Sequence, residues 1–132
     1  LACANIRQGD APTLYLHGAD VTAPAFDGAE FAAMPLHAGR FDLAAVLASL
    51  AERGINEVHV EAGATLSGAL LQAGLVDELL VYMAPVLLGE TARPLLAGLG
   101  IDTMAQRHAL QLLDVRHIGQ DLRLRYAPVA TA

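Results

Sequence analysis

The residues best suited to chemistry lie in one short stretch, "VEAGATLSGALL" (60–71). Glu61 offers a carboxylate where an apolar run stops, and Gly63 lets the backbone turn sharply and approach a ligand closely. Thr65 and Ser67 add two hydroxyl groups. Where a strand gives way to a helix, unpaired backbone N–H groups suit an anion such as a pyrophosphate. The stretch therefore indicates a ligand site at the start of a helix.

A purely structural interpretation of this stretch stays open. The spacing matches neither the dinucleotide-binding fingerprint nor a phosphate-binding P-loop, and Thr65 alone is able to cap an ordinary strand-turn-helix. Glu61 either caps that turn or accepts hydrogen bonds from a ligand, while Gly68 allows something to pack close to the helix. The amides expected to be available to an anion belong to Ala64, Thr65, Leu66 and Ser67.

The pattern of apolar residues predicts the elements that must position this stretch. Helices are expected over 41–54, with Asp42 at its start and Gly54 at its end, and over 65–73, ended by Gly74. Strands are expected over 13–18, 31–34 (weak), 56–63, 78–83, 110–118 and 121–128. A long Gly- and Pro-rich connection covers 89–109, and such loops are often functional.

Alternation of strands and helices predicts an α/β fold: a mixed, mainly parallel sheet flanked by helices. Gly119 and Gln120 form the turn of a C-terminal antiparallel hairpin. Its second strand places Leu122, Leu124 and Tyr126 on one face. The opposite face carries Asp121, Arg123 and Arg125.

Composition limits the classes of function. The 132 residues are 55% hydrophobic and carry a formal net charge of −6, which favours one domain with a core and disfavours nucleic-acid binding. The apolar runs are too short to span a membrane. The single cysteine, Cys3, permits no internal disulfide and no cysteine zinc set, and it suits a cytoplasmic protein. The spacing of the five histidines predicts no metal site.

A longer run carries a specific resemblance: "VHVEAGATLSGALLQAGLVDELLVYMAPVLLGETARPLL", followed by the tail "LLDVRHIGQDLRL". Over residues 41–127 the chain resembles the reductase domain of the bifunctional deaminase-reductase of bacterial riboflavin biosynthesis. That resemblance implies a dihydrofolate-reductase-like fold. It also implies a homodimer and NADPH-dependent reduction of 5-amino-6-(5-phosphoribosylamino)uracil to the ribitylamino form.

The resemblance also implies roles for single residues. Glu61 corresponds to the acid that contacts substrate, although many relatives have Pro at the position of Ala64. The catalytic residue stays unknown. The residues that correspond to the NADP site are Gly63, Ala64, Thr65, Leu66, Ser67, Gly68 and Ala69.

The same resemblance implies that residues 1–132 are the C-terminal portion of one reductase domain. The zinc deaminase domain, the only part expected to bind zinc, and the first part of the reductase domain are not in this sequence. We therefore expect the isolated chain to self-associate and to be inactive. Two alternatives stay open: a stand-alone reductase of the same superfamily that acts on another pteridine- or uracil-like substrate, and a non-catalytic dimerisation module.

Overall fold

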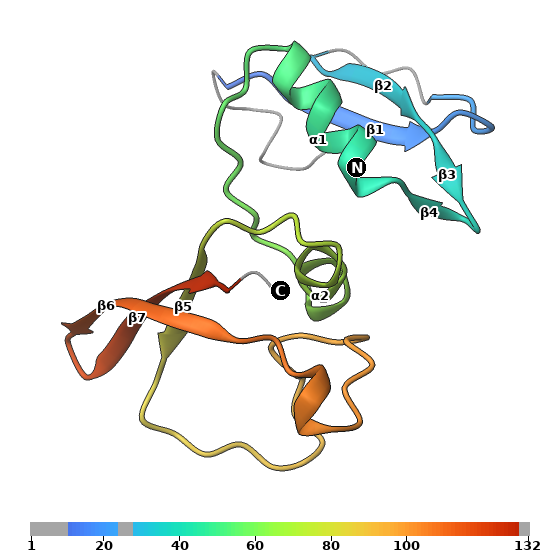
Figure 1. Ribbon diagram of the computed structural model, residues 1–132. Helices are drawn as coiled ribbons and strands as arrows, with labels where there is room; N and C mark the ends of the chain where they lie inside the picture. Colours follow the sequence, from blue (N-terminus) through green and yellow to red (C-terminus); the bar gives the residue numbers. More distant parts are fainter. Residues whose placement is uncertain (1–10, 24–27, 130–132) are drawn as a thin grey trace. The chain divides into compact units, whose positions relative to one another are not determined.

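The computed structural model describes residues 11–23 and 28–129, and the chain divides into two compact units, Leu1–Val58 and His59–Ala132. Cys3 lies outside the described residues. No helix in the described ranges is both long enough and apolar enough to cross a membrane. Figure 1 shows the elements of each unit.

The first unit is built on a parallel pair of strands, β1 (Leu14–Gly18) and β2 (Glu30–Met34). Tyr15 lies opposite Phe31 in this pair, and their rings stack with centroids 5.5 Å apart. Both strands are where the apolar pattern predicted them. Met34 at the end of β2 is the buried large side chain of this unit within the described ranges.

Two further elements of the first unit follow β2. The short strands β3 (Leu36–His37) and β4 (Arg40–Phe41) form a hairpin that the sequence did not predict. Its turn residues, Ala38 and Gly39, have φ angles of 50° and 74°, as the favoured two-residue hairpin turns require.

The predicted first helix is confirmed as α1 (Leu43–Glu52). Asp42 caps it by accepting a hydrogen bond from the Ala45 amide at 3.0 Å. Gly54 follows its end with a φ of 81°.

The predicted strand over 56–63 is wrong, because this segment has no regular secondary structure. Val58 and Val60 alternate as in a strand but are 42% and 43% exposed. Alternation favours an extended backbone, yet a strand forms only when a neighbouring strand pairs with its N–H and C=O groups. No described strand does so here.

The second unit holds α2 (Ala64–Gln72), β5 (Leu79–Met83), β6 (Leu110–Ile118) and β7 (Asp121–Pro128). The three strands form an antiparallel sheet in the order β5-β7-β6, with an irregularity in β6 between Leu112 and Asp114. The predicted C-terminal hairpin is confirmed, and Gly119 in its turn has a φ of 63°.

The strand pairing in the described ranges differs from the expected mainly parallel sheet. One pair, β1 with β2, is parallel, whereas β3–β4, β5–β7 and β6–β7 are antiparallel. The expected order needed residues 56–63 as a strand between the two helices. Because that strand is not formed, the mainly parallel arrangement is not seen. The presence of both helices and strands still agrees with the predicted α/β class.

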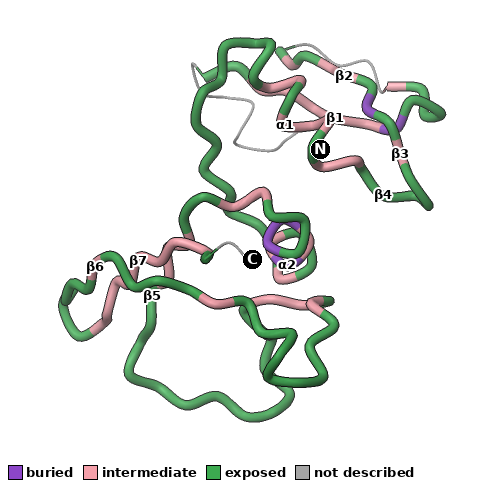
Figure 2. The backbone as a smooth tube through the Cα atoms, viewed as in Figure 1, coloured by how far each residue is buried: buried purple, intermediate pink, exposed green. Residues whose placement is uncertain are grey.

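The buried residues of the second unit within the described ranges lie on α2. Leu70 and Leu71 are buried, and so is Gly68, as the purple segment of α2 in Figure 2 shows. The long connection between β5 and β6 is exposed along most of its length and contains a short 3₁₀ helix, η2 (Met104–Gln106). Part of this connection returns to α2, where the Ala97 amide donates to the Ala64 carbonyl oxygen at 3.0 Å.

Candidate functional site

The predicted site residues occupy the start of α2 and the extended segment before it. Gly63, not Thr65, is the N-cap residue, with φ −73° and ψ 164° and no side-chain capping bond. Capping by Thr65, which the purely structural interpretation left open, is therefore not what the structure shows. An extended Gly63 turns the chain into the helix two residues earlier, which places Thr65 inside the first turn.

Two of the four amides expected to be open are already used. The Leu66 and Ser67 amides donate to the Gly63 carbonyl oxygen at 3.1 and 3.2 Å. The amides of Ala64 and Thr65 have no hydrogen-bond partner in the described part of the chain. Two adjacent N–H groups therefore remain for an anion at this helix start.

The side chains near these amides are likewise uncommitted. Neither Thr65 nor Ser67 makes a side-chain hydrogen bond with another described residue, and an added Cβ at Gly63 would meet no atom within 4 Å. The backbone here is therefore open to a ligand on the side of Gly63. An added anion would find two amides and two hydroxyl groups within one turn.

Gly68 has a different environment from Gly63. A Cβ added to Gly68 would overlap the Ala97 carbonyl oxygen. The prediction that this glycine lets something pack close to the helix is confirmed, and the neighbour is the protein's own backbone. A direct contact between Gly68 and a cofactor stays a prediction.

Glu61 lies just before the helix start, and its side chain is 86% exposed. Its polar neighbour is His59: the imidazole Nε2 lies 3.3 Å from the Glu61 Oε1. Glu61 does not cap α2, because no described amide donates to its carboxylate. Its acceptor capacity therefore remains for a ligand.

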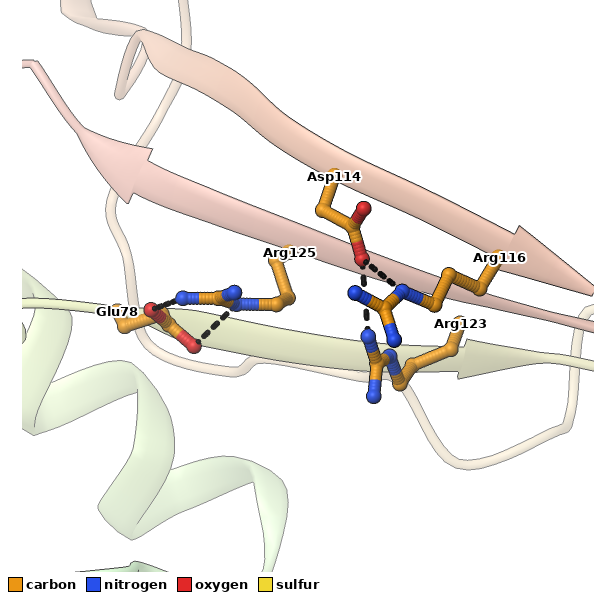
Figure 3. Close-up of polar contacts among 5 residues, drawn as sticks. All are labelled: Glu78, Asp114, Arg116, Arg123 and Arg125. Carbon is orange, nitrogen blue, oxygen red and sulfur yellow. Dashed lines mark hydrogen bonds and ion pairs between the residues drawn. The ribbon is translucent and has the colours of Figure 1, made fainter.

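The second unit also contains a charged cluster that the sequence reasoning did not predict as a group, made of Glu78, Asp114, Arg116, Arg123 and Arg125 (Figure 3). Arg125 binds Glu78 through two bonds, Nε–Oε1 at 2.9 Å and Nη2–Oε2 at 2.6 Å. Arg123 Nη2 and Arg116 Nε share Asp114 Oδ2, at 2.9 and 3.0 Å. The predicted alternation of β7 was the available signal, since it places Arg123 and Arg125 on one face.

These pairs change the acidity of the two carboxyl groups. The hydrogen bond from Arg125 holds the pKa of Glu78 below its usual value, against a smaller opposing effect of desolvation. The hydrogen bond from Arg123 likewise lowers the pKa of Asp114. The Glu78 carboxylate in turn raises the pKa of Arg125. The cluster thus stabilises charges that face one another across three strands.

No metal centre is found in the described ranges, where no three His, Cys, Asp or Glu side chains gather in a way that would hold an ion.

Comparison with known proteins assigns the chain to a family. Residues 4–124 match the RibD C-terminal domain, and the chain belongs to that family. Over 91 residues it is 47% identical to the riboflavin biosynthesis protein RibD of Escherichia coli K12. These residues are 69% of this chain and 25% of that protein.

Two further comparisons agree with this assignment. A protein of Buchnera aphidicola named 5-amino-6-(5-phosphoribosylamino)uracil reductase is 37% identical over 92 residues, which are 70% of this chain and 44% of that protein. The solved structure of Acinetobacter baumannii RibD matches with a TM-score of 0.69 and 39% identity, over 77% of this chain and 27% of that one. The chain thus spans about a quarter of the RibD proteins that it resembles.

Proposed function

We propose that this chain is the C-terminal portion of an NADPH-dependent reductase that converts 5-amino-6-(5-phosphoribosylamino)uracil to its ribitylamino form. The proposal rests on the Buchnera relative, whose name states that substrate. One observation of the site carries it further. An exposed, acceptor-only carboxylate, Glu61, directly precedes a helix start with two unpaired amides. We infer a dihydrofolate-reductase-like fold for the whole domain.

The cofactor is proposed to lie at the start of α2. The amides of Ala64 and Thr65 would donate to a phosphate oxygen of NADPH, and the hydroxyls of Thr65 and Ser67 would add two donors. The wall of that site would be completed by Gly63, Leu66 and Ala69. Gly68 would support it from behind through its packing against Ala97. When bound, NADPH supplies the hydride that reduces C1 of the open-chain ribosylimine.

Glu61 is proposed to contact the substrate. A ribosylaminouracil carries hydroxyl and amino donors, and an ionised carboxylate accepts hydrogen bonds from both. Holding the sugar in one orientation beside the cofactor is the contribution expected of Glu61, because an oriented substrate loses less entropy at the moment of reaction. No acid or base for the proton transfer is assigned.

Association into a homodimer in the cytoplasm is part of the proposal. On the face of the β5-β7-β6 sheet opposite the charged cluster, Met83, Leu112 and Val115 are each about half exposed. Apolar surface of this kind favours a subunit interface. The same observation supports the alternative of a dimerisation module, which would bind no NADPH.

The test compares Glu61→Gln with Glu57→Gln in the full-length protein, since its relatives are longer than this chain. Glutamine keeps the shape of Glu61 but removes the charge. We expect kcat/KM for the aminouracil to fall about 10- to 150-fold, the worth of one charged hydrogen bond, with the KM for NADPH unchanged. Glu57→Gln should leave both values unaltered.

Three outcomes would contradict the proposal. Loss of NADPH binding with normal use of the substrate would assign Glu61 to the cofactor. Absence of NADPH oxidation by the wild-type protein would favour the dimerisation module, and activity on a different pteridine or uracil alone would favour the stand-alone reductase.

A further inference from the structure

A histidine lies beside the carboxylate that is proposed to hold the substrate. His59 Nε2 is 3.3 Å from Glu61 Oε1, and the two side chains are 69% and 86% exposed. Both groups therefore contact each other and remain open to a ligand. The pair is attractive as an ion pair only when the imidazole carries a proton.

The surroundings of the pair add no second partner. Within the described residues of this unit, His59 and Glu61 lie within ion-pair distance of each other and of no other side chain of opposite charge. Glu57, two residues before His59, is the next acid along the chain, and the open amides of Ala64 and Thr65 begin α2. Changes in the charge of His59 should therefore be felt first by Glu61.

We propose that His59 is a positioning residue that orients the Glu61 carboxylate toward the substrate while the imidazole is protonated. This inference rests on the proposed function, because it needs Glu61 to bind the substrate. Histidine as a residue type loses its charge between about pH 5 and 8. Raising the pH across that range should release Glu61 and raise the KM for the aminouracil.

The experiment measures the KM for the aminouracil at pH 6 and pH 8 in the full-length protein and three variants. His59→Gln removes the charge, and His59→Lys keeps it throughout this range. His108→Gln is the matched control, since His108 is exposed in the long connection. The two His59 variants also record ionisation of the substrate phosphate, which titrates near about pH 6 and acts on every variant alike, whereas His108→Gln should keep the wild-type pH dependence.

Relative to that background, the wild-type KM should rise about two- to fivefold between pH 6 and 8, the range of an exposed ion pair. His59→Gln should lose this rise, with a high KM at both pH values. His59→Lys should lose it with a low KM at both. The KM for NADPH should stay constant in all of them, which reports an intact fold.

A His59→Gln variant that keeps the wild-type pH dependence would overturn the inference. The failure of the proposed function is distinguishable. If Glu61→Gln leaves both kcat and the KM for the aminouracil unchanged, then the substrate assignment of Glu61 is wrong. If Glu61→Gln raises that KM while His59→Gln has no effect on its pH dependence, only the role of His59 is wrong.

Discussion

The start of α2 and the charged cluster on the β5-β7-β6 sheet use polar groups in opposite ways. In the cluster, each carboxylate is held by at least one guanidinium at 3.0 Å or less. At the start of α2, two amides and two hydroxyls have no hydrogen-bond partner in the described chain, and the one described ion-pair partner of Glu61 is His59. Apart from the buried Arg123 Nε, which has no hydrogen-bond partner among the described residues, the cluster's paired groups have little capacity left for a ligand.

This difference separates two kinds of charged residue that look alike in a sequence. Glu61 and Glu78 are both acids beside apolar runs. Glu78 is bound by Arg125, which is 47 residues away in the chain, whereas Glu61 has no such distant partner in the described residues. A binding role is therefore better supported for Glu61 than for Glu78.

The largest effect is expected at Gly68, where α2 is committed to packing. In Gly68→Ala, the new Cβ would meet the Ala97 carbonyl oxygen, at a cost of about 3 kcal/mol, which the better helix propensity of Ala offsets by about 1 kcal/mol. We expect the free energy of unfolding to fall by about 2 kcal/mol in denaturant titrations. Gly89→Ala, where an added Cβ meets no atom within 4 Å, should change it by no more than about 0.5 kcal/mol.

An unfolding free energy for Gly68→Ala equal to that of Gly89→Ala would contradict this expectation. It would show that the segment around Ala97 moves aside freely, and that Gly68 is not needed for packing.

The second effect tests the open side of the same helix. Thr65→Glu places a negative charge beside the amides proposed to bind the NADPH phosphates. Repulsion of about 1–2 kcal/mol should raise the KM for NADPH about 5- to 30-fold. The helix itself should tolerate the change, because an acid in the first turn interacts favourably with the helix dipole. Unchanged thermal stability together with an unchanged KM for NADPH would move the cofactor away from α2.

The smallest effect is expected from the charged cluster, because exposed ion pairs contribute little. The pKa values of Glu78 and Asp114 are lowered in the folded state from usual values of 4.5 and 3.8. A lowered carboxyl pKa contributes stability above the usual value, and this contribution is lost as the pH falls through the folded-state pKa. The melting temperature should therefore drop more steeply between about pH 5 and 3 in the wild type than in Glu78→Gln/Asp114→Asn.

Thermal melts across that range check the expectation, with Glu90→Gln in the long connection as the control that keeps the wild-type slope. Equal slopes in the double variant and the wild type would show that the ion pairs persist in the unfolded chain or contribute nothing.

Local patterns predicted most of the single elements. Asp42 and Gly54 at the two ends of α1 act within one turn of the chain, so their effect can be predicted without the rest of the fold. The alternation in β7 is equally local. The strand predicted over 56–63 failed because the same alternation requires a partner strand that no local pattern supplies.

The sequence by itself determined the family, the helix that follows Gly63 and the polar residue types at its start, because these depend on neighbours along the chain. Only the tertiary structure decided which of those groups stay available. Gly68 is closed by Ala97 and Glu78 is paired with Arg125, through contacts between residues 29 and 47 positions apart. Such contacts depend on how the chain returns on itself, and residue type and spacing do not fix that return.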